Sequence, residues 1–144
     1  MIMKFKNQKG AAAVEFAIVL VLLLMLVFGI IEFGLLLYDK AVLTNASREG
    51  ARFGIVLSNP RHTNTEIQNV VTTYCSNYLI TFGGPTLVNI PTPIWTDNDG
   101  SGDITIGGDL SVTVTYKYTF LFMPKFVPIS NTKTLTATTL MKYE

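Results

Sequence analysis

The chain has 144 residues, of which 49% are hydrophobic and 15% are charged, so it can build one small domain and at most one membrane segment. Its 11 Lys and Arg residues against 10 Asp and Glu residues give a net charge of +1, and no basic run follows the N-terminal lysines, which argues against a nucleic-acid-binding surface. A single histidine, His62, and a single cysteine, Cys75, exclude zinc fingers, c-type haem attachment and an internal disulfide framework.

A long apolar stretch runs from Ala11 to Leu37, and its only charged residues are Glu15 and Glu32. A helix needs about 20 mostly apolar residues to cross a bilayer, so residues 11–37 are predicted to form a transmembrane helix rather than a buried helix of a soluble core. Lysines without acidic residues precede the stretch, so the positive-inside rule places the N-terminus in the cytoplasm and everything beyond about Tyr38 outside. Glu32 is expected to lie at the outer membrane interface. The protein is therefore predicted to cross the cytoplasmic membrane once and to carry an extracytoplasmic head.

A cleaved signal peptide would also begin with lysines and an apolar stretch, but its core usually has about 7–15 residues and ends at a small-x-small cleavage site. This stretch is longer, and no such site follows it, so we expect the helix to be retained. On its N-terminal side stands the segment Lys9-Gly10-Ala11-Ala12-Ala13-Val14-Glu15-Phe16. This segment resembles the cleavage site of type IV prepilins.

The resemblance implies that residues 1–10 are a leader and that a membrane aspartyl prepilin peptidase cuts after Gly10, leaving Ala11 as the N-terminus. It also implies that Glu15, beside Phe16, neutralises the N-terminal amine of a neighbouring subunit during assembly. An ionised carboxylate in the bilayer costs about 2.5–3.5 kcal/mol on insertion scales unless it meets a partner, which gives a physical reason for this pairing. The alternative is that Glu15 reaches back to the cytoplasmic interface, because it lies only about a turn inside the boundary.

Beyond the span, residues 38–58 are predicted to continue the helix as an amphipathic extension, because small or apolar residues recur every three or four positions. Asn59-Pro60 is expected to end it. Small residues also recur along it at four-residue intervals: Ala46, Gly50 and Gly54. This row either lets another backbone approach closely or packs under the protein's own sheet.

Three segments carry a more specific resemblance: Gly10-Ala11-Ala12-Ala13-Val14-Glu15-Phe16-Ala17, Phe28-Gly29-Ile30-Ile31-Glu32 and Ala46-Ser47-Arg48-Glu49-Gly50-Ala51-Arg52. Together they are similar to the TadE-like family of minor pilins, or pseudopilins, of tight-adherence (Flp-type) pilus systems. The closing segments of that family resemble Val112–Phe122, Met123-Pro124 and Leu135–Glu144. Many members carry a proline where this chain has Val21, so the helix kink that a proline would introduce is not implied here.

The resemblance implies a structural, non-enzymatic protein that is assembled into a pilus, or primes one, for adhesion or secretion. Implied partners are prepilin peptidase, other pilin or pseudopilin subunits, the pilus assembly platform and membrane lipid, and nucleic acid is not among them. A head of this size favours a minor subunit over the very short Flp major subunit. The chain would reside in the cytoplasmic membrane or in an extracellular pilus. The alternative is a signal-anchored extracytoplasmic module that binds calcium or another ligand and does not enter filaments.

The segment Arg48-Glu49-Gly50-Ala51-Arg52 has two interpretations. Arg48 and Arg52 lie one helical turn apart, which would let them bind a carboxylate or phosphate of a neighbouring subunit or of outer-leaflet lipid. The alternative is an ordinary solvated helix face on which Glu49 pairs with Arg52.

Residues 59–144 are predicted to form the head, so the chain as a whole is α+β: a long helix, a short second helix and a small antiparallel sheet. The capping-box pattern Thr63-x-x-Glu66 predicts that the second helix begins near Asn64 and runs to about Leu79. Alternating apolar and polar residues predict two long strands, and shorter runs predict two more. The four expected strands are Leu110–Phe122, Leu135–Met141, Thr86–Ile90 and Asp103–Ile106.

One loop suggests metal binding, because Asp97-Asn98-Asp99-Gly100-Ser101-Gly102-Asp103 resembles the first half of an EF-hand. The position of the bidentate glutamate is taken by Gly108, and Asp109 follows one place late. Such a loop either binds Ca²⁺ weakly or is a plain solvated turn. The candidate ligands are Asp97, Asp99, Ser101, Asp103 and Asp109.

No catalytic residue and no cofactor other than this Ca²⁺ are predicted, because neither His62 nor Cys75 stands in a nucleophile motif. Cys75 is expected to be a buried thiol on the second helix or, alternatively, a crosslink between subunits.

Overall fold

The computed structural model describes residues 8–82, 88–97, 107–121 and 131–143. Over these residues the order of elements is α1 (Gln8–Ile55), α2 (Asn64–Tyr78), β1 (Val88–Asn89), β2 (Ile94–Thr96), β3 (Asp109–Thr119) and β4 (Thr132–Lys142). One very long helix, a short helix and a small antiparallel sheet confirm the predicted α+β class.

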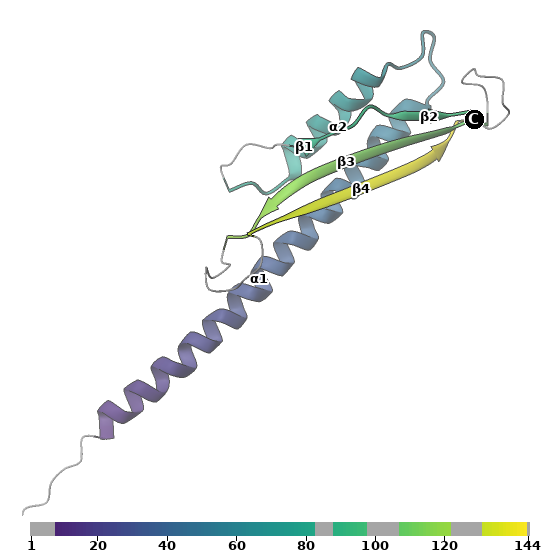
Figure 1. The fold of residues 1–144 in the computed structure, drawn as a ribbon. Helices are drawn as coiled ribbons and strands as arrows, with labels where there is room; N and C mark the ends of the chain where they lie inside the picture. The colour runs from purple at the N-terminus through teal and green to yellow at the C-terminus, as the bar shows by residue number, and fades with distance from the viewer. Residues whose placement is uncertain (1–7, 83–87, 98–106, 122–130, 144) are drawn as a thin grey trace, which may run out of the picture.

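Helix α1 has 48 residues and is therefore about 72 Å long at about 1.5 Å per residue. Its first half extends alone as a stalk, and α2 and the sheet pack along its second half to form the head (Figure 1). The expected helix over 11–58 is thus continuous, although it begins at Gln8 and ends at Ile55, a few residues before Asn59-Pro60.

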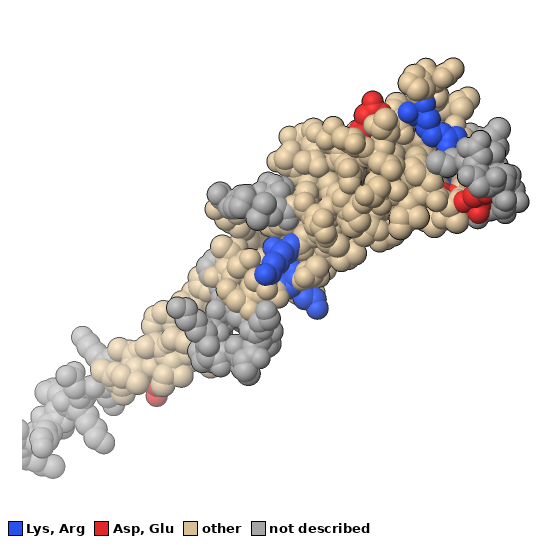
Figure 2. Space-filling view, turned by 45° about the horizontal axis from the view of Figure 1, so that its top comes forward, with Lys and Arg blue, Asp and Glu red and all other residues tan. Residues whose placement is uncertain are grey.

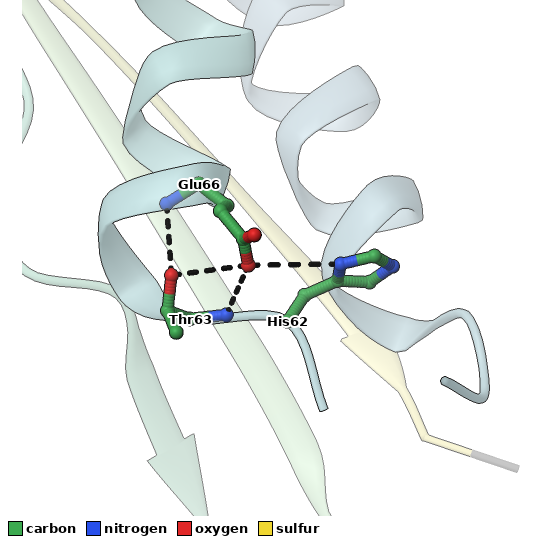
Figure 3. Close-up of polar contacts among 3 residues, drawn as sticks. All are labelled: His62, Thr63 and Glu66. Carbon is green, nitrogen blue, oxygen red and sulfur yellow. Dashed lines mark hydrogen bonds and ion pairs between the residues drawn. The ribbon is translucent and has the colours of Figure 1, made fainter. Parts of the chain in front are cut away.

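The start of α2 confirms the predicted capping box (Figure 3). The Thr63 hydroxyl accepts a hydrogen bond from the Glu66 backbone N–H at 3.2 Å, and the Thr63 backbone N–H donates to the Glu66 carboxylate at 2.7 Å. These bonds to Thr63 lower the pKa of Glu66, and His62 Nδ1 lies 3.8 Å from the same carboxylate. The reciprocal bonds satisfy orphan N–H groups of the first turn, which fixes where α2 begins.

Strand β3 is the centre of the sheet. It pairs with β4 along its whole length, from Asp109↔Lys142 to Thr119↔Thr132, and its other edge pairs with the short strands β1 and β2. The two long strands and the strand near Thr86–Ile90 are therefore confirmed, with β1 limited to Val88–Asn89 within the described residues. The expected strand Asp103–Ile106 lies outside the described residues. Strand β2 was not predicted, because three residues are too few to show an alternating pattern.

The core lies between the inner face of the sheet and the two helices. The alternation in β3 is confirmed, since every second residue from Leu110 to Tyr118 is buried. The buried core residues of the helices and of β4 are Leu43, Ala46, Ala51, Ile67, Val71, Cys75, Leu135 and Ala137.

The row of small residues on α1 faces this core. Ala46 is fully buried, and Gly50 and Gly54 are buried as well. A Cβ atom at Gly50 would clash with Val71 of α2, and one at Gly54 would clash with Leu110 of β3. The row thus lets the protein's own head sit close to α1, which was one of the two interpretations that the sequence left open.

Gly50→Ala is expected to lower the free energy of unfolding by about 1–3 kcal/mol, because the added methyl group has no room beside Val71. The matched control is Gly34→Ala in the same helix, where no atom lies within 4 Å of the added Cβ and a small gain in helix propensity is expected. Thermal unfolding of both variants in detergent measures the difference. Equal melting temperatures for the two variants would contradict the packing described here.

Candidate functional site

The stalk is the most unusual surface of the molecule. Side chains from Gly10 to Ile31 are exposed, and the stretch Gly10–Ile55 is a single helix long and apolar enough to cross a membrane. Its most apolar window has a mean hydropathy of 3.0 and is 0% buried. An exposed apolar surface of this size, with Glu15 as its one charged residue, is rare on a soluble monomer, so it fits a membrane anchor or a protein interface.

The residues implied in processing and assembly lie at the start of this stalk. Gly10 and Ala11 are in the first turns of α1, and Glu15 and Phe16 follow on its exposed surface. Within the described part of the chain no group bonds to the Glu15 carboxylate. The geometry therefore leaves Glu15 accessible to a partner outside this chain, and its role stays a prediction.

The stalk meets the head at Glu32, which is only 8% exposed. Its carboxylate accepts a hydrogen bond from the Tyr118 hydroxyl at 2.6 Å and another from the Leu121 backbone N–H at 3.0 Å. Hydrogen bonds to an ionised carboxylate are shorter and stronger than hydrogen bonds between two neutral groups. Burial and the bond to Glu32 raise the pKa of Tyr118, so the phenol keeps its proton and remains a donor.

The sequence indicated no partner for Glu32, and these two hydrogen bonds supply two donors, while its expected position at the outer membrane interface stays a prediction. The structure buries Glu32 against the end of β3 and the residues just after it, which are more than eighty positions away along the chain. A sequence signal did exist, namely a glutamate at the end of an apolar stretch and a tyrosine on the inward face of a long strand. Nothing in the sequence paired the two.

Three further polar contacts tie α1 to the head, and those of Asp39 and Ser47 each lie about two helical turns beyond the previous level, on the same face as Glu32. Asp39 is fully buried and accepts a bond from the Ile80 backbone N–H at 3.2 Å, and the adjacent Lys40 donates to the Thr136 carbonyl of β4. Ser47 shares a hydrogen bond of 2.7 Å with Thr139 of β4. The head is thus fixed to α1 by a line of bonds as well as by the apolar core.

Among these polar side chains of α1, the Asp39 carboxylate has the least complete hydrogen bonding. Its second oxygen, Oδ2, has no hydrogen-bond partner within the described residues. Burial raises the pKa of Asp39, and the bond from Ile80 only partly offsets this effect.

The predicted cationic pair lies on the outer surface of α1. Arg48, Glu49 and Arg52 are all exposed, and no ion pair joins them in the part of the chain that the structure describes. Glu49 instead lines an open groove of about 410 Å³ between α1 and α2, together with Tyr74 and Tyr78. Water competes effectively for such exposed charges, so a fixed pair between Glu49 and Arg52 gains little.

Most of the predicted calcium loop lies outside the residues that the structure describes. Asp99, Ser101 and Asp103 lie outside the described residues, and Asp109 is the first residue of β3. Among the described residues no group of three or more His, Cys, Asp or Glu side chains could hold a metal ion. Calcium binding therefore stays a prediction.

Cys75 is a free thiol in the core of the head. Burial raises its pKa to about 11, so little thiolate forms at neutral pH. This environment favours the predicted buried thiol over a crosslink between subunits.

Tyr118→Phe is expected to lower the free energy of unfolding of the head by about 1.5–3 kcal/mol, because it removes a donor from a buried carboxylate. Tyr78→Phe is the matched control, since Tyr78 is 52% exposed and no described contact uses its hydroxyl as a donor. Urea titration of both proteins in detergent measures the effect. A loss no larger for Tyr118→Phe than for Tyr78→Phe would show that the bond to Glu32 does not stabilise the head.

Asp39→Asn is expected to change how stability depends on pH. Folding raises the pKa of Asp39 above 3.8, so the folded state binds the carboxyl proton more tightly than the unfolded state does. The stability that this proton contributes is complete below about pH 3.8 and is lost as the pH rises through the raised pKa of the folded state. Asparagine keeps an oxygen for Ile80 and removes the buried charge. The melting temperature of the variant relative to the parent protein should therefore increase from about pH 4 to about pH 8. A difference that is constant over this range would contradict the burial of a charged Asp39.

Comparison with known proteins gives a match that falls within α1. The family model described as "TadE-like protein" matches residues 10–52, which cover the stalk and the part of α1 under the head and amount to less than a third of the chain. No curated protein and no solved structure matches the chain. The resemblance to the TadE-like family that the three helical segments carry is therefore confirmed over residues 10–52.

Proposed function

We propose that this protein is a prepilin-type structural subunit, a minor pilin or pseudopilin that is assembled into a tight-adherence (Flp-type) pilus or primes its assembly. The observation that carries the proposal is the exposed apolar stalk, because it coincides with the TadE-like match over residues 10–52. The proposed role is structural rather than enzymatic, and it serves adhesion or secretion.

The proposed sequence of events begins in the cytoplasmic membrane. Prepilin peptidase cuts after Gly10, and the stalk stays in the bilayer with the head outside. The new amine of Ala11 is then paired with Glu15 of a neighbouring subunit as the assembly platform moves the subunit out of the lipid. Both the exposed position of Glu15 and the cost of an unpaired carboxylate in a bilayer support this step.

The contacts of Glu32 refine where the span ends. Residues 11–31 measure about 31 Å at about 1.5 Å per residue, which matches a hydrocarbon core of about 30 Å. Because Glu32 is already bonded to the head, we place the outer boundary at Ile31 instead of Leu37. The remaining exposed apolar residues up to Tyr38 then lie at the level of the lipid headgroups and just above them.

The intact mass and N-terminal sequence of the membrane-extracted protein test the proposal, with and without an active prepilin peptidase. A peptidase-dependent start at Ala11 is expected, and it should be lost in Gly10→Leu but kept in the matched control Gly29→Ala. An uncut chain in both strains would contradict the proposal and favour a signal-anchored module that binds calcium or another ligand. A start beyond Leu37 would identify a cleaved signal instead.

Assembly is tested separately with Glu15→Ala. The variant is expected to be processed at Ala11 but to be depleted at least tenfold from sheared filaments or from crosslinked complexes with other subunits, since the pairing charge is missing. Glu49→Ala is the matched control, because Glu49 is an exposed glutamate of the same helix outside the span. Equal incorporation of the two variants would contradict the proposed role of Glu15.

A further inference from the structure

Two exposed lysines lie at the end of the head that is nearest to the stalk. Lys117 is near the end of β3, and Lys133 is near the start of β4, directly opposite Tyr118 in the sheet register. Tyr118 in turn donates to Glu32, where the stalk begins. We call Lys117 and Lys133 the basal lysines, since the sheet register and the bond to Glu32 fix them at the base of the head.

The contact of Lys40 with β4 gives a second measure of how far the basal lysines lie from Glu32 along α1. It lies about 12 Å beyond Glu32 along α1, and its ammonium reaches the Thr136 carbonyl of β4. Lys133 precedes Thr136 by three positions, so it lies about 10 Å nearer to the stalk along β4. The basal lysines are therefore close to the level of Glu32.

Among the described residues, no exposed acidic side chain offsets this charge at the base of the head. Glu32 and Asp39 are buried and bonded within the head. The other acidic residues of the head that the structure describes lie farther from the stalk: Glu49, Glu66, Asp97 and Asp109. In Figure 2, one group of Lys and Arg side chains lies beside the stalk and another lies at the far end of the head, and the acidic side chains that the head shows on this face lie away from the group beside the stalk.

The proposed position of the membrane places the basal lysines near lipid headgroups. If the hydrocarbon ends at Ile31, the headgroup layer covers about the next 5–7 Å, which is the level of the basal lysines. Phosphate oxygens of anionic lipids are the acceptors that a lysine ammonium meets there, and the long lysine side chain can turn toward them. The exposed apolar residue Phe33 lies in the same layer.

We propose that Lys117 and Lys133 bind the phosphate groups of anionic phospholipids in the outer leaflet and so seat the head on the membrane surface. Each such lysine contributes about a fivefold preference for an anionic surface. Two lysines orient the head but do not anchor it, so the contact is weak enough to break when the subunit leaves the membrane. The inference rests on the membrane span of the proposed function and is independent of cleavage and assembly.

Lysine acetylation rates measured by mass spectrometry test the proposal on the full chain in nanodiscs with one copy each. Lys117 and Lys133 are expected to react about fivefold more slowly in discs with phosphatidylglycerol than in discs of phosphatidylcholine alone. The difference should vanish in about 1 M NaCl, where the Debye length is about 3 Å. Lys142 is the internal control, because it is exposed and lies about 30 Å from Lys133 at the other end of β4.

Three results would overturn the proposal. Equal rates in the two lipids would show that the basal lysines do not meet lipid, and an equal slowing of Lys142 would show a general effect of surface charge. Inorganic phosphate that slows the basal lysines to the same extent in phosphatidylcholine discs would identify a free phosphate site instead.

A double variant, Lys117→Gln with Lys133→Gln, gives an independent readout. Both side chains are exposed, so the fold should be retained. The parent protein is expected to melt at a higher temperature in anionic than in neutral discs, and the double variant should lose this gain, whereas Lys142→Gln should keep it. A gain that survives in the double variant would contradict the proposal. Since neither readout involves cleavage at Gly10 or Glu15, a failed pilin assignment would leave these results unchanged.

Discussion

The bond network of Glu32 is the constraint on which the architecture depends. A carboxylate at the end of an apolar helix would be costly if it were left in lipid or buried without donors. Tyr118 near the end of β3 and Leu121 just beyond it supply two donors, so the head must extend down to this level of α1. The same bonds therefore satisfy the buried carboxylate of Glu32 and fix where along α1 the head begins.

Farther along α1, other polar side chains also form hydrogen bonds to the head. Asp39 and Ser47 follow Glu32 at intervals of about two helical turns, Lys40 is next to Asp39, and each of the three bonds to the head. Gly50 and Gly54 then allow α2 and β3 to approach the helix backbone. These bonds and the close packing together hold the head against this helix.

The sequence predicted the local features of this fold well. The apolar stretch, the capping box at Thr63 and Glu66, and the alternation in β3 each follow from a period or a motif that lies within a few residues. The contact between Glu32 and Tyr118 could not be predicted, because it joins two distant segments whose pairing depends on the register of the sheet. The same holds for Gly50 and Gly54, since their spacing fits contact with a second subunit as well as with the protein's own head. Strand β2 is too short to have a pattern of its own.

Cysteine accessibility along the exposed face of α1 tests the central claim most directly, namely that the stalk spans the membrane up to Ile31 and the head begins at Glu32. Single cysteines at Leu24, Met25, Leu37 and Tyr38 would be treated with a membrane-impermeant maleimide on intact cells, and the unmodified chain would give the background from the buried Cys75. The account predicts labelling at Leu37→Cys and Tyr38→Cys and none at Leu24→Cys and Met25→Cys. Protection at Leu37→Cys and Tyr38→Cys, or labelling at Leu24→Cys and Met25→Cys, would contradict it.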